Sequence, residues 1–459
     1  MWYGVCGTEE YQGALIFCPV SVVADFSHHL YILSTLPGGS MRLTIRNVAK
    51  IKEASFELDG ITVVAGENGS GKSTAAKALP SLVSANSRMN EDIEYQKKRS
   101  ISRWLEDYYW AAEKQKNGRV FPSSKTGREE IFLQTAGRIL DSAGNPLSEN
   151  SLSGIISDVF SVSRNDVHLS REQLSAFNHI LEMPEEELES YVVLRSFRER
   201  FGEQVNSSYN DNEASVSVAC DNGRKSEVVF AANEVRSFEP FDNVSRKMNA
   251  VFLEAPARFD SASPDMGKRI NPTLMELLMK DVPSDEIFED YRKAVESLKQ
   301  IDSFIDDVIH GSFIRDAESR ELTFRDDQMP SSSFRMCNVA SGVKVFAVLR
   351  RLVQNRSLNE NDILVIDEPE TGLHPEWQIK LARLLILMVQ KMNIRVFLTT
   401  HSLYFLRAVE VLSSEMALGD RTCYYLMKKE SDNPLYKAFD VNGKTEEIYR
   451  ELYRPLEEL

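Results

Sequence analysis

The stretch that decides the fold is Ile61-Thr-Val-Val-Ala-Gly-Glu-Asn-Gly-Ser-Gly-Lys-Ser-Thr74. An apolar, β-branched run leads into a loop with three glycines, and a helix-prone run follows the loop. The stretch matches GxxxxGK[ST] in full, in the required order of strand, loop and helix. Glycines let successive backbone N–H groups turn inward toward phosphate oxygens, beside a helix N-terminus. The sequence therefore predicts a phosphate-binding loop rather than a plain glycine loop before a helix.

Each position of this loop has an expected role. The lysine of such a loop reaches the β- and γ-phosphates of ATP, and the next hydroxyl ligates Mg²⁺. Lys72 is therefore expected to be catalytic, Ser73 to bind the metal, and the cofactors to be ATP and Mg²⁺. The residues predicted to bind the nucleotide here are Gly66, Asn68, Gly69, Ser70, Gly71, Lys72, Ser73 and Thr74.

Composition narrows the class of protein. The chain has 459 residues, of which 42% are hydrophobic and 27% charged, so it can bury a core and is expected to form two to four domains. A net charge of −15 disfavours a surface that broadly coats nucleic acid, but it leaves room for a local basic groove. No apolar run is long enough to span a bilayer, so no membrane contact is expected. Five scattered cysteines without a CxxC pair indicate a reduced, cytoplasmic protein.

Residues 1–40 differ in character from the rest of the chain. Glu9 and Glu10 precede an apolar patch that Pro19 interrupts, and no basic start or cleavage site marks a secretory signal. A regular strand pattern opens only at Met41. We expect Met41 to be the true start and residues 1–40 to be a non-native translated leader; the alternative is a short ordered N-terminal arm.

The middle of the chain, residues 86–245, is predicted to be a mainly helical insertion with a β-hairpin around Asp221-Asn-Gly223. Residues 117–150 contain two short strand-like runs. Residues 97–110 combine basic side chains with four aromatic rings. This combination is able to clamp nucleic acid, but amphipathic packing with a solvated charged face is the favoured interpretation.

A second chemical signal lies some three hundred residues after the glycine loop. The apolar strand pattern of residues 361–366 ends in Asp367 and Glu368. In a phosphate-loop ATPase, Asp367 would hold the Mg²⁺ shell, and Glu368 would orient and deprotonate the attacking water. The next predicted strand, residues 394–399, leads to His401, which would then act as a switch histidine at the γ-phosphate.

A further candidate lies just upstream, where Ser341 and Gly342 open a predicted helix. A helix start of this kind is a second anion-binding feature. It has no obvious phosphate to bind within one subunit and would complete the site of another. A simple helix cap is the equally weighted alternative.

Four motifs together resemble the ABC-type ATPase head shared by the SMC and Rad families: GENGSGKST at 66–74, ASG at 340–342, ILVIDEPE at 363–370 and TTHS at 399–402. The segment Asp367 to Pro375 reads DEPETGLHP, which is similar to the DEPExxLHP of OLD-like bacterial ATPases. The serine-glycine motif departs from the transporter signature, which has two glycines and a glutamine.

The resemblance implies an α/β P-loop NTPase fold: an ABC-type head with an antiparallel β lobe and a mainly helical insertion. Residues 41–85 and 246–459 would form the head. Two heads would enclose nucleotide, with Ser341 and Gly342 supplied by the second subunit, which gives a homo-oligomer built on head-to-head dimers.

OLD nucleases carry a C-terminal TOPRIM domain, for which the segment before Leu459 has no room. The chain therefore looks like the ATPase of two-gene antiphage systems such as Septu or PARIS, which control a separate nuclease effector of HNH or TOPRIM type, with possible DNA contact. The alternatives are an SMC/Rad-like DNA-repair ATPase, the nucleotide-binding subunit of a transporter, and a scaffold that holds ATP without useful turnover.

Overall fold

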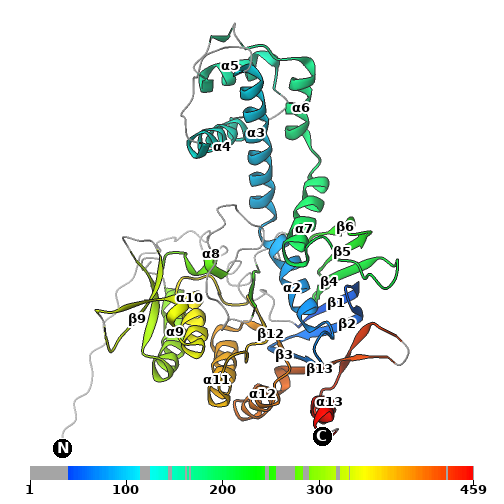
Figure 1. The fold of residues 1–459 in the computed structure, drawn as a ribbon, viewed down its shortest axis with the longest axis vertical. Coiled ribbons are helices and arrows are strands. Elements are labelled where there is room, and N and C mark those ends of the chain that lie inside the picture. Colours follow the sequence, from blue (N-terminus) through cyan, green and yellow to red (C-terminus); the bar gives the residue numbers. More distant parts are fainter. Residues whose placement is uncertain are drawn as a thin grey trace, which may run out of the picture. The chain divides into compact units, whose positions relative to one another are not determined.

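A mixed eleven-stranded sheet organises the chain, in the order β6-β5-β4-β1-β2-β14-β13-β3-β12-β11-β7 (Figure 1). Strands β13, β3, β12, β11 and β7 run parallel to one another, whereas β2, β1, β4, β5 and β6 pair antiparallel. The predicted α/β fold with an antiparallel lobe is confirmed. The strands are β1 (Met41–Val48), β2 (Ile51–Leu58), β3 (Ile61–Gly66), β4 (Ala214–Cys220), β5 (Lys225–Ala231), β6 (Glu234–Glu239), β7 (Ala250–Glu254), β11 (Ile363–Asp367), β12 (Arg395–Thr400), β13 (Thr422–Lys429) and β14 (Tyr436–Asp440).

This computed structural model describes residues 40–113, 125–142, 147–160, 163–164, 167–242, 248–254, 274–282, 289–316, 321–329, 331–430 and 433–457. Residues 1–39 lie outside the described residues, so the structure does not test the prediction that residues 1–40 are a non-native leader.

Most of the helices pack on the sheet or form the insertion. They are α2 (Lys72–Ser87), α3 (Met89–Glu113), α4 (Lys125–Ser142), α5 (Glu149–Phe160), α6 (Arg171–Glu182), α7 (Glu185–Phe201), α8 (Leu274–Leu278), α9 (Glu289–Val308), α10 (Ser341–Gln354), α11 (Pro375–Met392), α12 (Leu403–Glu415) and α13 (Glu446–Glu457). A small sheet of β8 (Gly311–Arg315), β9 (Leu322–Asp326) and β10 (Ser333–Arg335) lies beside α10. Within the described residues, no helix is long and apolar enough to cross a membrane.

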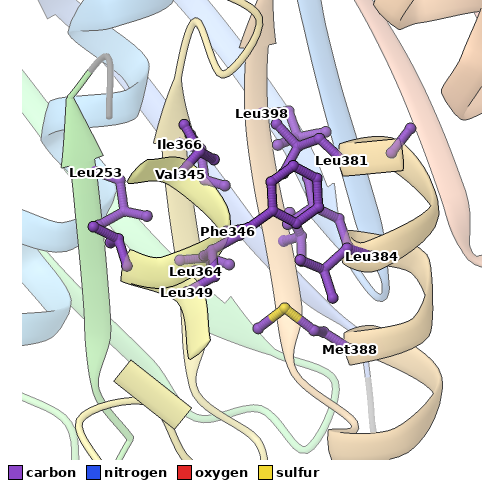
Figure 2. Packing of buried hydrophobic residues seen from close by; sticks show 14 of the residues in the cluster. Leu253, Val345, Phe346, Leu349, Leu364, Ile366, Leu381, Leu384, Met388 and Leu398 are labelled. Atoms are coloured by element: carbon purple, nitrogen blue, oxygen red, sulfur yellow. The ribbon is translucent and has the colours of Figure 1, made fainter. Parts of the chain in front are cut away.

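The two faces of the central strands bury different helices, because successive side chains of a strand point to opposite sides. On β3, Val64 packs in the cluster that contains α2, whereas Val63 and Ala65 pack with α10, α11 and α12. Figure 2 shows the cluster on the face that carries α10, α11 and α12, where Phe346 of α10 meets side chains of β12 and α11. The glycine loop and the serine-glycine helix start therefore precede helices on opposite faces of the sheet.

The predicted hairpin around residues 221–223 exists, but it is part of the head sheet and not of the insertion. Strand β4 pairs with β1 in the register Met41↔Cys220. Its buried side chains, such as Val216 and Val218, join the cluster of α2. The pairing joins segments about 170 residues apart, which no local pattern reveals.

The insertion, α3 to α6, has a small core of its own. The expected strand-like runs of residues 117–150 are wrong for the described part, since 125–142 form α4. Its buried residues Phe132, Ala136 and Ile139 recur at helical spacing and pack with α3. The aromatic rings of residues 104–109 also belong to this core, as shown by the Trp104–Tyr108 stack with 5.6 Å between ring centroids.

The core beneath α10 gives a stability prediction. Phe346 is fully buried and meets the Trp377 ring edge-on at 5.6 Å between centroids. Phe346→Ala removes this ring and leaves a cavity, which costs about 3–5 kcal/mol of unfolding free energy. Urea unfolding measures the loss. Tyr404→Ala, at a site 69% exposed, is the control and stays within about 0.5 kcal/mol of the parent. Equal effects would contradict this packing.

Candidate nucleotide-binding site

The glycine loop between β3 and α2 is pressed against neighbouring strands, and this decides where glycine is required. Gly66 has φ 151° and Gly71 has φ 96°, values that side chains rarely allow. A Cβ atom at Gly66 would lie 2.7 Å from the Met427 carbonyl oxygen, and one at Gly71 would lie 2.9 Å from Ile51 Cγ1. The backbone therefore makes a curl that only glycine permits at these two positions.

Lys72 begins α2 and lies under this curl. Its side chain is buried, and the ammonium Nζ donates to the carbonyl oxygens of Gly66 and Glu67, both at 2.8 Å. Burial lowers the pKa of Lys72, while the nearby negative charges of Glu368 and Asp367 raise it. The loop and the paired acids, far apart in the sequence, thus share one electrostatic environment.

Strand register explains how Asp367 and Glu368 reach the loop. Strand β12 lies between β11 and β3, and Thr399 is aligned with both Asp367 and Val64. The Thr399 hydroxyl donates to the buried Asp367 carboxylate. The backbone N–H of Glu368 is 3.1 Å from the Thr399 carbonyl oxygen, at a φ of 51°. Glu368 is thus held in a strained turn directly after the strand.

His401 follows β12 and faces the acids. Its Nδ1 lies 3.4 Å from Glu368 Oε1 and 3.6 Å from Glu370 Oε1, and its side chain is half-exposed. The structure therefore brings together Lys72, Asp367, Glu368 and His401, all of which the sequence singles out.

Glu370 is a site residue that the sequence reasoning did not identify. Its carboxylate Oε1 accepts hydrogen bonds from the Thr400 hydroxyl at 2.7 Å, the His401 N–H at 3.0 Å and the Ser402 N–H at 3.2 Å. Burial raises the pKa of Glu370, whereas these hydrogen bonds lower it. The sequence signal that could have identified it is the final Glu of Asp367-Glu-Pro-Glu370. The Glu370 carboxylate fixes the turn that carries His401.

Two cationic residues near the loop also had no sequence signal. Lys50, in the β1–β2 turn, places Nζ 3.6 Å from where a Cβ of Gly69 would lie. Arg454 of α13 forms an ion pair with Glu67. Inside the loop, the buried Ser70 hydroxyl has no hydrogen-bond partner among the described residues. These groups add donors and positive charge around the curl, which suits a phosphate ligand.

Ser341 and Gly342 are placed apart from this group. The Ser341 hydroxyl donates to the Gly372 carbonyl at 2.8 Å, and a Cβ on Gly342 would lie 2.8 Å from the Trp377 ring. The first turn of α10 therefore packs against the start of α11, on the face opposite α2. Its assignment to nucleotide binding remains a prediction.

The oxygen donors fit a magnesium ion. Mg²⁺ usually takes one or two protein oxygens and completes its shell with water and phosphate. Ser73 in the first turn of α2 and the carboxylate of Asp367 supply such oxygens. Among the described residues, no group of three or more His, Cys, Asp or Glu could hold a metal ion.

The Glu370 contacts generate a prediction. Glu370→Ala leaves the buried Thr400 hydroxyl and the His401 N–H without this acceptor, whereas the Ser402 N–H keeps the Thr400 hydroxyl oxygen at 3.0 Å. A buried donor that loses its partner costs about 1–3 kcal/mol. We expect the unfolding free energy to fall by at least about 2 kcal/mol in urea titrations. Glu370→Gln keeps an acceptor oxygen and is the matched control with a smaller loss. An unchanged stability of the alanine variant would contradict the clamp.

Part of this chain matches a known protein family, and most of the chain is similar to several solved structures. Residues 222–407, which contain β11 and β12, match the family described as AAA domain, putative AbiEii toxin, Type IV TA system. No curated protein matches the chain. A structure of an SMC head bound to the C-terminal winged-helix domain of ScpA is 10% identical, with 88% of this chain and 98% of that chain covered and a TM-score of 0.42.

Two further structures are similar in the same way. The Smc head of Pyrococcus furiosus with an extended coiled coil, bound to the C-terminal domain of ScpA, is 11% identical, covers 90% of this chain and 98% of its own, and has a TM-score of 0.39. An ATP-binding cassette of an ABC transporter in its ADP conformation is 10% identical, with 91% and 96% covered and a TM-score of 0.32. The structure shows a mixed α/β fold with a phosphate-loop motif, and residues 222–407 match this AAA family.

Proposed function

We propose that this chain binds ATP with Mg²⁺ and hydrolyses it. The observation that carries the proposal is the convergence of Lys72 with Asp367 and Glu368 at the carboxyl ends of neighbouring parallel strands. The curled backbone and Lys72 would hold the phosphates, and Ser73 and Asp367 would hold Mg²⁺, whose charge stabilises the transferred phosphoryl group.

Glu368 is the proposed general base. It follows the strand that supplies Asp367, and its carboxylate lies 3.4 Å from His401 Nδ1. A carboxylate fixed beside the γ-phosphate site can orient water and accept its proton, and His401 can bridge that carboxylate to the phosphate. The Glu370 clamp keeps His401 in place for this role.

We infer further that two subunits share each nucleotide. The start of α10 lies on the face of the sheet opposite α2, which supports a role for Ser341 and Gly342 at the site of a second copy rather than at the loop of their own subunit. A helix N-terminus with a small residue lets backbone N–H groups approach a phosphate closely. A dimer of this kind would have two composite sites related by a two-fold axis.

At the cellular level, we propose that the ATPase is a cytoplasmic subunit of a bacterial antiphage complex that controls a separate nuclease. The support is the resemblance of DEPETGLHP to OLD-like ATPases and the matched family, whose description concerns toxins. Expression of the chain with its neighbouring gene in a phage-sensitive host tests this role. We expect plaque numbers to fall only when both genes are present and Lys72 is intact. Unchanged plaque numbers would contradict it.

Two substitutions separate binding from turnover. Lys72→Ala removes the charged donor to the phosphates and weakens ATP binding about tenfold or more. Glu368→Gln keeps binding but lowers turnover about 100-fold or more, because the general base is lost. Equilibrium binding of a fluorescent ATP analogue and steady-state phosphate release measure the two quantities. Wild-type hydrolysis by Glu368→Gln would show that the base is another group.

Mixing inactive variants tests the shared site. Glu368→Gln and Ser341→Arg each abolish both sites of their own dimers. Random pairing of the two variants restores one intact site in half of the dimers, so about a quarter of wild-type phosphate release returns. Glu368→Gln mixed with Lys72→Ala is the matched control and stays inactive, because both lesions lie in the same half-site. Equal activities of the two mixtures would exclude the composite site.

A further inference from the structure

Helices α3 and α7 pack along each other (Figure 1). Side chains of both helices line an open cleft. Its volume is about 380 Å³. Helix α3 contributes residues spaced by three, four and seven positions, and α7 does the same, so one face of each helix lines the cleft. The lining residues are Gln96, Arg99, Ser100, Arg103, Met183, Leu188, Tyr191 and Arg195.

The cleft carries positive charge in an otherwise acidic protein. Three arginines line it and no acidic residue does. Arg99 and Arg103 are exposed, and neither forms an ion pair within the described residues. Arg195 is paired with Glu199 on its own helix at 3.3 Å. Against a net charge of −15, this local concentration of guanidinium groups selects for an anionic ligand.

A buried amide also belongs to the lining of the cleft. Gln96 is only 8% exposed and lines the cleft, yet its Nε2 has no hydrogen-bond partner within the described residues. A buried amide without a partner costs about 1–3 kcal/mol unless a ligand supplies the acceptor. Phosphate and base oxygens are acceptors of the required kind.

An aromatic surface completes the cleft. Tyr191 is 50% exposed, and Met183 and Leu188 line the cleft beside it. Its ring can stack on a base, as aromatic rings do in proteins that bind single strands. The aromatic residues of α3 that suggested this role in the sequence are used instead in the insertion core.

We propose that the α3–α7 cleft binds single-stranded nucleic acid. Arg99 and Arg103 contact backbone phosphates, Gln96 donates to a phosphate or base oxygen, and Tyr191 stacks on a base. The cleft is lined by α3, α7 and Met183, and no residue of the candidate nucleotide site lines it, so the proposal does not rest on ATP hydrolysis.

Fluorescence anisotropy of the full-length chain with a labelled single-stranded oligonucleotide tests this, at several salt concentrations. We expect Arg99→Gln/Arg103→Gln to weaken binding at least tenfold and to reduce the slope of log K against log salt by about 1.4, the value for two phosphate contacts. Tyr191→Ala weakens binding about tenfold with the slope unchanged. The control Arg46→Gln/Arg407→Gln removes two exposed arginines elsewhere and leaves both quantities unchanged.

Competitors distinguish a strand from a smaller phosphate ligand. An unlabelled oligonucleotide should displace the probe, whereas inorganic phosphate and AMP should not at the same phosphate concentration. Displacement by AMP at equal phosphate concentration would replace the proposal by a mononucleotide site. Absence of oligonucleotide binding by the wild type, or equal weakening in the control, would overturn it. Circular dichroism of each variant verifies that it is folded.

Discussion

Three parallel strands, β3, β12 and β11, end at the same edge of the sheet, and their alignment is the constraint on which the site depends. Thr399 lies between Val64 and Asp367 in register. Its hydroxyl donates to Asp367 at the end of β11, and its carbonyl oxygen accepts from the N–H of Glu368 just after the strand. A slip of one residue would turn Asp367 to the other face of the sheet, away from the loop. The geometry of the candidate site is therefore a consequence of sheet register.

Burial makes this arrangement electrostatically demanding. Lys72 is buried beneath the glycine loop, and four acidic side chains, Glu368, Asp367, Glu370 and Glu67, act on its charge. Removing charges from water is costly unless each finds a partner, and here negative charge exceeds positive. A bound divalent cation and the N–H donors of the loop would balance the excess negative charge. The backbone of Glu368 is strained at φ 51°. Such strain costs stability but holds the functional side chain in a fixed position.

The insertion is joined to the candidate site in two ways: the chain runs directly from α2 into α3, and α7 packs against both helices. Helix α2 begins at Lys72, and only Arg88 separates its end from α3. Helix α7 packs against both α2 and α3. One wall of the basic cleft, α3, thus follows directly on the helix that the glycine loop begins, and the other wall, α7, packs against that helix. A change at one end can be transmitted only if it favours a different packing of these helices, since coupling needs a difference between states.

Local patterns in the sequence were enough to predict the glycine loop, the apolar strand that leads to Asp367 and Glu368, and the hairpin around residues 221–223. Loop chemistry, apolar runs and turn residues act over a few positions, so local patterns predict them. Three features became visible only in the folded chain: β4 pairs with β1, residues 125–142 form a helix packed on α3, and Glu370 holds the His401 turn. Each of these depends on partners distant in the chain or across a turn, because pairing and burial override local propensity once a core forms.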